Sequence, residues 1–314
     1  MAATQPRIVI TGAAGLVGQN LVVELESQGY ANLVAIDKHA YNLAILRELH
    51  PRITAIEADL AAPGAWQSAL AGADCVVLLH AQITGKHGAD FIRNNIDATG
   101  RVLQACRDQH VPYLVHVSSS VVNSRATDHY TTTKRTQEQM VAASGIAHCV
   151  LRPTLMFGWF DPKHLGWLSR FMARTPVFPI PGDGRFMRQP LYERDFCRCL
   201  ADCIARRPAG RAYDIVGDTR IDYVDIIRTI KRVKGLRTRL VHIPIGFFSL
   251  LLRTYALFSR KPPFTADQLA ALTAGDDFTG VDTRAVFNVT QTPFEEAARE
   301  AFCDPRYADV VLKR

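Results

Sequence analysis

The stretch Ile8–Gly18, which reads I-V-I-T-G-A-A-G-L-V-G, predicts how the first part of the chain folds. It opens with an apolar run, Ile8–Ile10, that has the length of a short buried strand. Three glycines follow at the spacing G-x-x-G-x-x-G. The apolar residues after them recur at helical spacing as far as Leu25, and Gly29 stands where a helix would end. A strand, a glycine turn and a helix in this order predict a site for the pyrophosphate of a dinucleotide.

Each glycine of this stretch has its own expected role. Gly12 allows the tight turn, Gly15 lets the pyrophosphate approach the backbone, and Gly18 lets the helix pack against the strand. The free N–H groups of the first helical turn, which includes Leu16 and Val17, would face the phosphates. A glycine triplet on its own also fits an ordinary turn, so the interpretation depends on residues elsewhere in the chain.

Composition limits the class of protein. The chain has 314 residues, 48% of them hydrophobic, which is enough for a large core and two lobes. The net charge of +7 is scattered without a long basic block, so we expect a solvated surface and no nucleic-acid partner. Seven cysteines without a C-x-x-C pair indicate reduced thiols and no metal site. Residues 1–7 lack the apolar stretch of a signal peptide, and we expect a cytoplasmic protein.

The first half of the chain alternates strand and helix patterns. Further strands are expected at Leu33–Ile36, Ile53–Ile56, Cys75–Leu79, Leu114–Val117 and His148–Leu151. Helices are expected at Tyr41–Leu49, Ala65–Leu70, Phe91–Cys106 and Thr131–Ala143. This rhythm predicts an α/β fold with a doubly wound parallel sheet of the Rossmann type, whose ligands lie at the carboxyl ends of the strands.

The rhythm becomes irregular after Pro153. We expect a Rossmann domain over residues 1–152 and a smaller mixed α/β substrate lobe over residues 153–314, some segments of which return to the first sheet. The elements expected in this second part are helices at Arg194–Ala205, Tyr223–Val233 and Ala266–Ala274 and strands at Tyr213–Val216 and Leu240–Ile243.

One segment of the second part, Ile243–Phe258, is almost wholly apolar. It is too short to span a membrane comfortably, and Arg253 falls inside it. We expect a buried or partner-facing helix in preference to an interfacial membrane anchor.

An acidic residue follows the second expected strand. Asp37 lies about twenty residues beyond the glycine stretch, where a carboxylate accepts hydrogen bonds from the adenosine ribose. A carboxylate there repels a 2′-phosphate, so NAD is expected as cofactor in preference to NADP. Lys38 comes next, and its positive charge would reduce the preference for NAD over NADP. The alternative interpretation of Asp37 is a surface carboxylate at the end of a strand.

Tyr130 and Lys134 stand four residues apart and share one helix face. An ammonium held beside a phenol would lower its pKa from about 10 and favour the phenolate. The serines before this helix, Ser119 and Ser120, could hydrogen-bond a substrate oxygen. Together these groups could move a proton while a hydride moves to or from nicotinamide, although a tyrosine–lysine pair on a helix face is common by itself.

Further motifs occur in one order along the chain. They are Asp59-Leu60, His80-Ala81, Asn95, Ser118–Ser120, Leu151–Pro153 and Pro181–Gly184. With the glycine stretch and the tyrosine–lysine pair they resemble the extended branch of the short-chain dehydrogenase/reductase superfamily, the NAD-dependent epimerase/dehydratase family. The resemblance covers almost the whole chain and implies an NAD-dependent enzyme.

The resemblance assigns a role to each matching residue. It implies that Tyr130 is the catalytic acid/base, that Lys134 holds the nicotinamide ribose, and that Ser120 orients the substrate oxygen, with Ser119 as its rival. Asn95 would be structural. The residues that the resemblance places around NAD are Gly12, Gly15, Leu16, Val17, Gly18, Asp37, Lys38, Asp59, Leu60, Ala81, Lys134 and Pro153. His80 fits a packed histidine at a strand end better than a catalytic group.

The chain also departs from the family pattern. Leu155 replaces the asparagine of R-P-x-N-x-Y-G that can hold a sugar-nucleotide diphosphate, and Val121 and Val122 replace the acidic pair of sugar dehydratases. The valines count against dehydration. Arg188 matches an arginine that binds diphosphate in sugar-nucleotide epimerases, and Arg185 is a weaker candidate.

Three functions are compatible with these residues. The first is an oxidoreductase or epimerase that acts on a hydroxyl or ketone carbon of a nucleoside-diphosphate sugar. The second is a reductase or dehydrogenase of an apolar, sterol- or flavonoid-like alcohol or ketone. The third belongs to another class, a non-catalytic NAD-binding assembly or sensor subunit, because a fold alone does not determine function. A homodimer is expected from the resemblance only.

Overall fold

The computed structural model describes residues 5–258, 269 and 272–313. Its centre is a parallel sheet of seven strands in the order β11-β6-β5-β4-β1-β2-β3. The strands are β1 (Ile8–Thr11), β2 (Leu33–Asp37), β3 (Thr54–Glu57), β4 (Cys75–Leu78), β5 (Tyr113–Val117), β6 (Ala147–Pro153) and β11 (Arg211–Ile215). The order reverses between β1 and β4, so the predicted doubly wound Rossmann sheet is confirmed.

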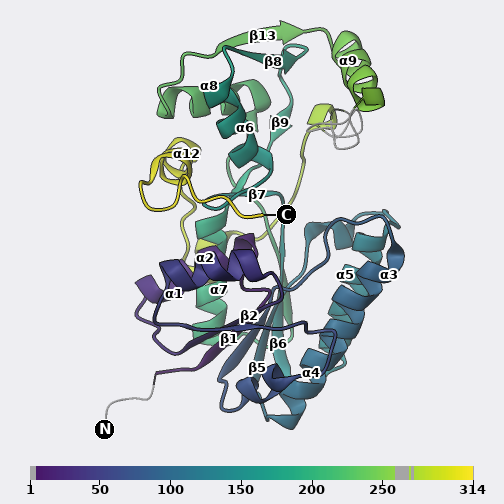
Figure 1. Cartoon of the computed structure of the whole chain (residues 1–314), viewed down its shortest axis with the longest axis vertical. Helices are drawn as coiled ribbons and strands as arrows, with labels where there is room; N and C mark the ends of the chain where they lie inside the picture. Colours follow the sequence, from purple (N-terminus) through teal and green to yellow (C-terminus); the bar gives the residue numbers. More distant parts are fainter. Residues whose placement is uncertain (1–4, 259–268, 270–271, 314) are drawn as a thin grey trace.

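Helices cover both faces of this sheet (Figure 1). On one face lie α1 (Leu16–Ser27), α2 (Ala40–Leu49) and α7 (Glu193–Arg206); on the other lie α3 (Gly88–Phe91), α4 (Ala98–Asp108) and α5 (His129–Ala142). Successive side chains of β1 point to opposite faces. Ile8 and Ile10 join the core beneath α1, whereas Val9 joins the core beneath α4. A fully apolar strand therefore has both faces buried, as expected for a central parallel strand.

The helix predicted over Phe91–Cys106 is interrupted in the structure. Between α3 and α4 the chain forms a π-helix, Ile92–Asp97, whose wider turn is common at functional sites. The buried Asn95 side chain accepts a hydrogen bond from the backbone N–H of Gln82 (2.6 Å) and donates to Thr133 Oγ1 (2.9 Å). Asn95 thus connects this helix to the segment after β4 and to α5, which is the structural role that the resemblance implied.

The second lobe consists of short strand pairs and helices. The strands are β7 (Met156–Phe157), β8 (Val177–Pro181), β9 (Met187–Arg188), β10 (Leu191–Tyr192), β12 (Ile221–Asp222) and β13 (Arg239–Ile243). The helices are α6 (His164–Arg174), α8 (Tyr223–Val233), α9 (Ile245–Phe258), α11 (Thr283–Phe287) and α12 (Phe294–Cys303). Of the predicted helix Ala266–Ala274, residues 266–268 and 270–271 lie outside the described residues, and 269 and 272–274 are helical.

The chain returns to the first sheet after residue 153. The strand predicted at Tyr213–Val216 is β11, which pairs with β6 and closes one edge of the central sheet. The helix predicted at Arg194–Ala205 is α7, which packs against α1.

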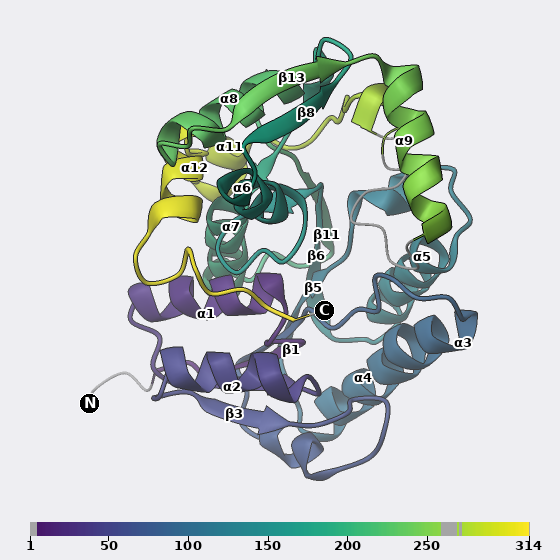
Figure 2. The same ribbon diagram turned by 45° about the horizontal axis from the view of Figure 1, so that its top comes forward.

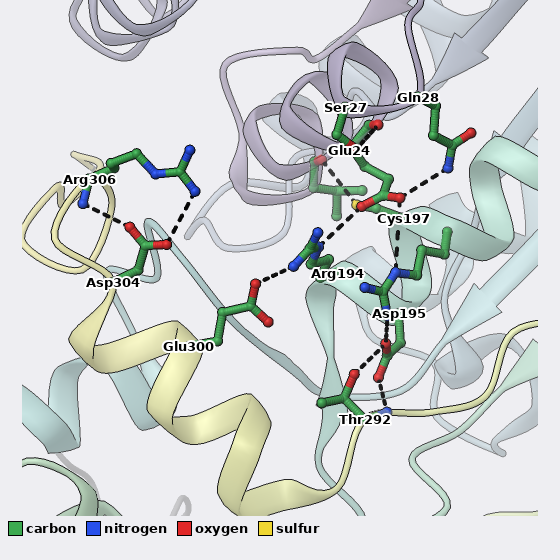
Figure 3. A network of polar contacts seen from close by, with 12 residues as sticks. Glu24, Ser27, Gln28, Arg194, Asp195, Cys197, Thr292, Glu300, Asp304 and Arg306 are labelled. Atoms are coloured by element: carbon green, nitrogen blue, oxygen red, sulfur yellow. Dashed lines mark hydrogen bonds and ion pairs between the residues drawn. The ribbon is translucent and has the colours of Figure 1, made fainter.

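A polar network on α7 connects the two parts of the protein (Figure 3). Arg194 pairs with Glu24 of α1 (3.2 Å) and with Glu300 of α12. Next to it, the Asp195 carboxylate accepts hydrogen bonds from the backbone N–H (2.7 Å) and the hydroxyl (2.9 Å) of Thr292. Carboxylates and a guanidinium from three helices therefore fix how the carboxyl-terminal segment lies against the first lobe.

The apolar segment Ile243–Phe258 differs from expectation in one respect. Its helical conformation is confirmed by α9. A buried helix is wrong for this segment, since Phe247, Leu250 and Leu251 are exposed, whereas a partner-facing helix stays a prediction. In the part of the chain that is described, no helix is long and apolar enough to cross a bilayer.

Candidate active site

The glycine loop between β1 and α1 has the geometry that its sequence predicts. Gly12 has φ +70°, and a Cβ there would lie 2.5 Å from the backbone nitrogen of His80. A Cβ on Gly18 would lie 2.4 Å from the Ala13 carbonyl oxygen. Gly15 is exposed at the start of α1, and no side chain among the described residues caps this helix by a hydrogen bond. The loop leaves a helix N-terminus open to an anion.

Asp37 at the end of β2 lies against this loop. Its carboxylate accepts hydrogen bonds from the backbone N–H of Ala14 (3.0 Å) and of His39 (2.8 Å). Lys38 instead reaches across to Asn94, whose side-chain oxygen accepts from its ammonium at 2.6 Å. A negative charge therefore stands beside the loop, as recognition of an unphosphorylated adenosine ribose requires.

Asp59 and Leu60 lie beyond β3, beside Asp37. Leu60 is buried in the core, and Asp59 accepts from the backbone N–H of Ala61 (3.0 Å). Arg93, on the π-helix, pairs with Asp59 at 2.5 Å. The sequence analysis missed Arg93, because nothing in the local pattern shows that a π-helix carries it to this strand end.

His80 follows β4 with both ring nitrogens hydrogen-bonded. Nδ1 contacts Thr11 Oγ1 at 2.8 Å and Nε2 contacts Thr99 Oγ1 at 3.0 Å. Burial, with a contribution from the nearby Lys134 ammonium, lowers the pKa of His80 to about 3, so the imidazole is neutral. The interpretation as a packed histidine fits this geometry. Ala81 follows directly, at the carboxyl end of β4.

Tyr130 lies in the first turn of α5, where the Asp128 side chain caps the helix by accepting from the Thr131 N–H (3.0 Å). The Ser119 hydroxyl interacts with the Tyr130 phenol and acts to lower its pKa. Ser120, which the resemblance favoured, instead begins the 3₁₀ helix Ser120–Asn123. The structure thus brings Ser119 to the phenol.

Lys134 lies one turn further along α5 and is fully buried. Its ammonium donates to the Val117 carbonyl oxygen at the end of β5 (2.8 Å). Loss of water on burial, only partly offset by the Glu138 charge, lowers the pKa of Lys134 to about 7. The lysine is held where it meets the carboxyl end of β5, and its charge changes near neutral pH.

The expected effect of Lys134 on Tyr130 does not appear in the structure. Burial raises the pKa of Tyr130, the Ser119 hydrogen bond lowers it, and the Asp128 charge raises it further, with a net increase. The expectation that the ammonium lowers this pKa is therefore wrong for the protein alone. The physical reason is that the Lys134 ammonium points to a backbone carbonyl and is itself destabilised by burial.

The two arginines predicted to bind substrate lie in the second lobe. Arg188 on β9 pairs with Asp276 (3.1 Å) and is mostly buried, whereas the exposed Arg185 pairs with Asp222 (3.0 Å). Leu155, which follows β6 at its carboxyl end, is 44% exposed. Both arginines have carboxylate partners, so an anionic substrate would compete with these carboxylates for them.

The described cysteines are all free, and no three histidine, cysteine, aspartate or glutamate side chains within the described ranges form a group that could hold a metal ion. The polar groups that the structure places around the glycine loop and the end of β5 are backbone N–H groups, hydroxyls, a carboxylate, a phenol and an amine.

A doubly wound sheet with a glycine loop after its first strand, and with serine, tyrosine and lysine side chains around the end of β5, is typical of oxidoreductases of the short-chain type. Residues 8–216 match the model of the NAD dependent epimerase/dehydratase family, and the chain belongs to this family. The identification made from the motifs, the NAD-dependent enzyme class and the NAD cofactor class are thereby confirmed.

Relatives with named activities align with about 70% or more of this chain. The chain is 26% identical over 240 residues to the ceramide reductase of Caulobacter vibrioides, covering 76% of this chain and 73% of the relative. It is 26% identical over 258 residues to a dTDP-glucose 4,6-dehydratase of Actinoplanes, covering 70% and 80%. The fold is similar to that of a Bacillus cereus UDP-glucuronic acid 4-epimerase solved with NAD, with TM-score 0.69, 21% identity and coverage of 94% and 96%.

Proposed function

We propose that this protein is an NAD-dependent oxidoreductase or epimerase that transfers a hydride at a hydroxyl or ketone carbon, with Tyr130 as acid/base. The observation that carries this proposal is the placement of Tyr130 in the first turn of α5, one helical turn from Lys134, whose ammonium donates to the Val117 carbonyl at the carboxyl end of β5. Ligands of doubly wound sheets bind at these strand ends.

The residues present fit NAD. A Cβ at Gly15 has only the Gly12 carbonyl oxygen nearby, at 3.3 Å, so the space beside the loop is open to a pyrophosphate. The first turn of α1 would hold the pyrophosphate, Asp37 the adenosine ribose and Lys134 the nicotinamide ribose. Ala81 and Pro153, at the ends of β4 and β6, would flank the nicotinamide end. When bound, NAD supplies the hydride acceptor, which the protein's own side chains do not provide.

The protein's own groups move the proton. In the oxidation direction the Tyr130 oxygen accepts the proton of the substrate hydroxyl, and in reduction it returns a proton to the ketone oxygen. Ser119 would orient the substrate oxygen beside the Tyr130 phenol, and Ser120 remains its rival for that task.

For the substrate we infer a nucleoside-diphosphate sugar. Arg188 and Arg185 on the second lobe would bind the diphosphate, with Arg188 exchanging Asp276 for phosphate oxygens. The relatives named as a dTDP-glucose dehydratase and a UDP-glucuronic acid epimerase support this class. Val121 and Val122, in the 3₁₀ helix after Ser120, count against dehydration because they cannot exchange protons with a substrate.

A second candidate substrate is an apolar ketone or alcohol. The observation that favours it is the 44% exposure of Leu155, an apolar side chain at the position where the family has its diphosphate-binding asparagine. The ceramide reductase relative acts, by its name, on a lipid. A polar substrate gains nothing from an exposed leucine, whereas an alkyl chain buries it.

Ligand-dependent thermal stability separates these candidates. We expect NAD to raise the melting temperature more than NADP, and a uridine- or thymidine-diphosphate sugar to raise it further in the presence of NAD. If a long-chain ketone raises the melting temperature in the presence of NAD and the sugar nucleotides do not, the result would support the second candidate. Turnover that disappears in Tyr130→Phe with unchanged NAD binding supports the acid/base assignment. If Tyr130→Phe keeps the biological activity of the parent, the non-catalytic assembly subunit is the better function.

Oligomeric state is a separate part of the proposal. We propose a homodimer, which sedimentation equilibrium of the purified protein tests directly.

A further inference from the structure

The outer end of the second lobe carries an apolar helix face that the described residues leave exposed. On α9, Phe247, Leu250 and Leu251 are 53%, 59% and 46% exposed. Their positions differ by three and four residues, so they lie on one face, where Thr254 continues them with its hydroxyl bonded to the Leu250 carbonyl (2.9 Å). A contiguous apolar face of this kind marks an interaction surface.

The strand pair that leads into α9 also exposes apolar side chains. In the β8–β13 pair, Phe178 and Ile180 point into the core of the second lobe. The alternate side chains point outward, and among them Val177 and Val241 are exposed. Figure 1 shows β8 and β13 at the tip of the second lobe, with α9 beginning at the end of β13.

Positive charge lies beside the exposed valines of the strand pair. Two hollows of about 510 and 820 Å³ are lined by Val177 and Val241, respectively, and share Leu236 and Arg239. Their basic lining residues are Arg174, Arg228, Lys231, Arg232, Arg237 and Arg239. Among the described residues that line either hollow, none is acidic.

Part of this charge is neutralised within the chain. Arg228 pairs with Asp225 (2.8 Å), and Arg232 pairs with Glu295 (2.6 Å). The other four cations line the hollows without an ion pair to any carboxylate that the structure describes. The surface therefore keeps an excess of positive charge next to exposed apolar side chains.

We propose that α9 and the basic hollows together form a docking surface for an anionic phospholipid bilayer. A helix of 14 residues is about 21 Å long, too short to span the bilayer core, and it suits the boundary between headgroups and acyl chains. The apolar face enters that boundary, while the arginines and lysine contact lipid phosphates.

Charge complementarity selects this occupant. A second copy of the chain docked through the same face would bring two positively charged surfaces together. The phosphates of a nucleic acid would pair with the cations of the basic hollows, but Phe247 and Leu250 would remain exposed to water. A bilayer with anionic headgroups offers both negative charge and a hydrophobic interior.

The proposed docking helix and the helix that carries Tyr130 lie on one side of the molecule. Figures 1 and 2 both show α9 on the same side of the molecule as α5, the helix that carries Tyr130. The proposal holds for either substrate class, because it concerns the position of the site and not its chemistry.

Vesicle co-sedimentation of the full-length protein tests the proposal. The probes are vesicles of phosphatidylcholine alone and of phosphatidylcholine mixed with phosphatidylglycerol. We expect binding to the anionic vesicles that weakens with added salt, and little binding to the neutral ones. The double variant Phe247→Ser/Leu250→Ser should bind at least tenfold more weakly, and the control Ile92→Ser, an exposed apolar residue of the first lobe, should bind like the parent.

A second pair of variants tests the charge. Arg237→Glu/Arg239→Glu should reduce binding to anionic vesicles at least tenfold, whereas Arg52→Glu, exposed on the first lobe, should change it little. Far-ultraviolet circular dichroism establishes that each variant is folded. Absence of binding to anionic vesicles, equal binding to neutral vesicles, or self-association through α9 in place of vesicle binding would each overturn the proposal. None of these measurements requires substrate or turnover, so a wrong substrate leaves the test intact.

Discussion

Replacement of Lys134 by methionine is expected to stabilise the protein while it removes the amine that we propose holds the nicotinamide ribose. Lys134 is fully buried, and its pKa falls from 10.5 in water to about 7 in the folded chain. At about 1.4 kcal/mol for each tenfold change in proton affinity, the charged form costs the folded state about 4 kcal/mol at pH 7. Methionine has a similar shape and no charge, so most of this cost disappears.

A smaller loss opposes the gain. The Val117 carbonyl would lose the hydrogen bond from the ammonium, which is worth about 1–2 kcal/mol. We therefore expect Lys134→Met to raise the free energy of unfolding by about 2–3 kcal/mol at pH 7. For a chain of 314 residues this corresponds to a melting temperature about 3–5 °C higher.

The pH dependence gives the sharper test. The unfolded chain binds the lysine proton up to about pH 10.5 and the folded chain only up to about pH 7, so the parent gains stability as pH rises between these values. The advantage of the variant should therefore shrink above pH 7 and vanish by about pH 9–10. Urea unfolding at several pH values measures this directly. Lys86→Met, at an exposed lysine, is the matched control and should show no such trend.

Two results would refute the reasoning. A variant less stable than the parent at pH 7 would mean that the hydrogen bond to Val117 outweighs the burial of the charge. A stability difference that does not change with pH would mean that Lys134 is not the group whose pKa is lowered.

Three further predictions concern other buried or site residues. Glu193 is fully buried, neither of its carboxylate oxygens has a hydrogen-bond partner among the described residues, and burial raises its pKa to about 8. The folded protein tolerates the protonated Glu193 side chain, which is present below about pH 4.5, and loses stability as pH rises toward 8 because the buried carboxyl group must ionise. In urea unfolding, Glu193→Gln should therefore have a free energy of unfolding about 2–4 kcal/mol higher than the parent at pH 8 and equal to the parent near pH 4.5. In titration calorimetry, Asp37→Ala should weaken NAD binding about tenfold and reduce the ratio of NAD affinity to NADP affinity. Unchanged NAD affinity would contradict the assignment of Asp37 to the adenosine ribose. Arg188→Ala should weaken binding of a diphosphate sugar at least tenfold and leave NAD binding unchanged, so equal loss for both ligands would place Arg188 elsewhere.

Much of the first lobe could be predicted from local sequence. The apolar run at Ile8–Ile10 and the glycines that follow fix a strand, a turn and a helix because only glycine fits at Gly12 and Gly18. The continuous hydrophobicity of the other strands requires two covered faces, which a doubly wound sheet provides.

The sequence also placed the candidate site residues at the strand ends, but not their contacts. Tyr130 and Lys134 share a helix face by spacing alone. Which serine acts on the phenol depends on the turn after β5, where Ser120 enters a 3₁₀ helix and the Ser119 hydroxyl acts to lower the pKa of Tyr130. Side-chain pairing across such a turn is set by backbone geometry that no residue pattern encodes.

Burial and charge state were decided by the tertiary structure. The sequence shows that Lys134 is near Tyr130, yet only the packed protein shows an ammonium without water, bound to Val117. The same holds for α9, whose apolar composition predicts a helix but does not say which neighbours cover it. Local composition and spacing determine which elements form, whereas solvation, pKa and exposure depend on residues distant in the chain that only the folded structure brings together.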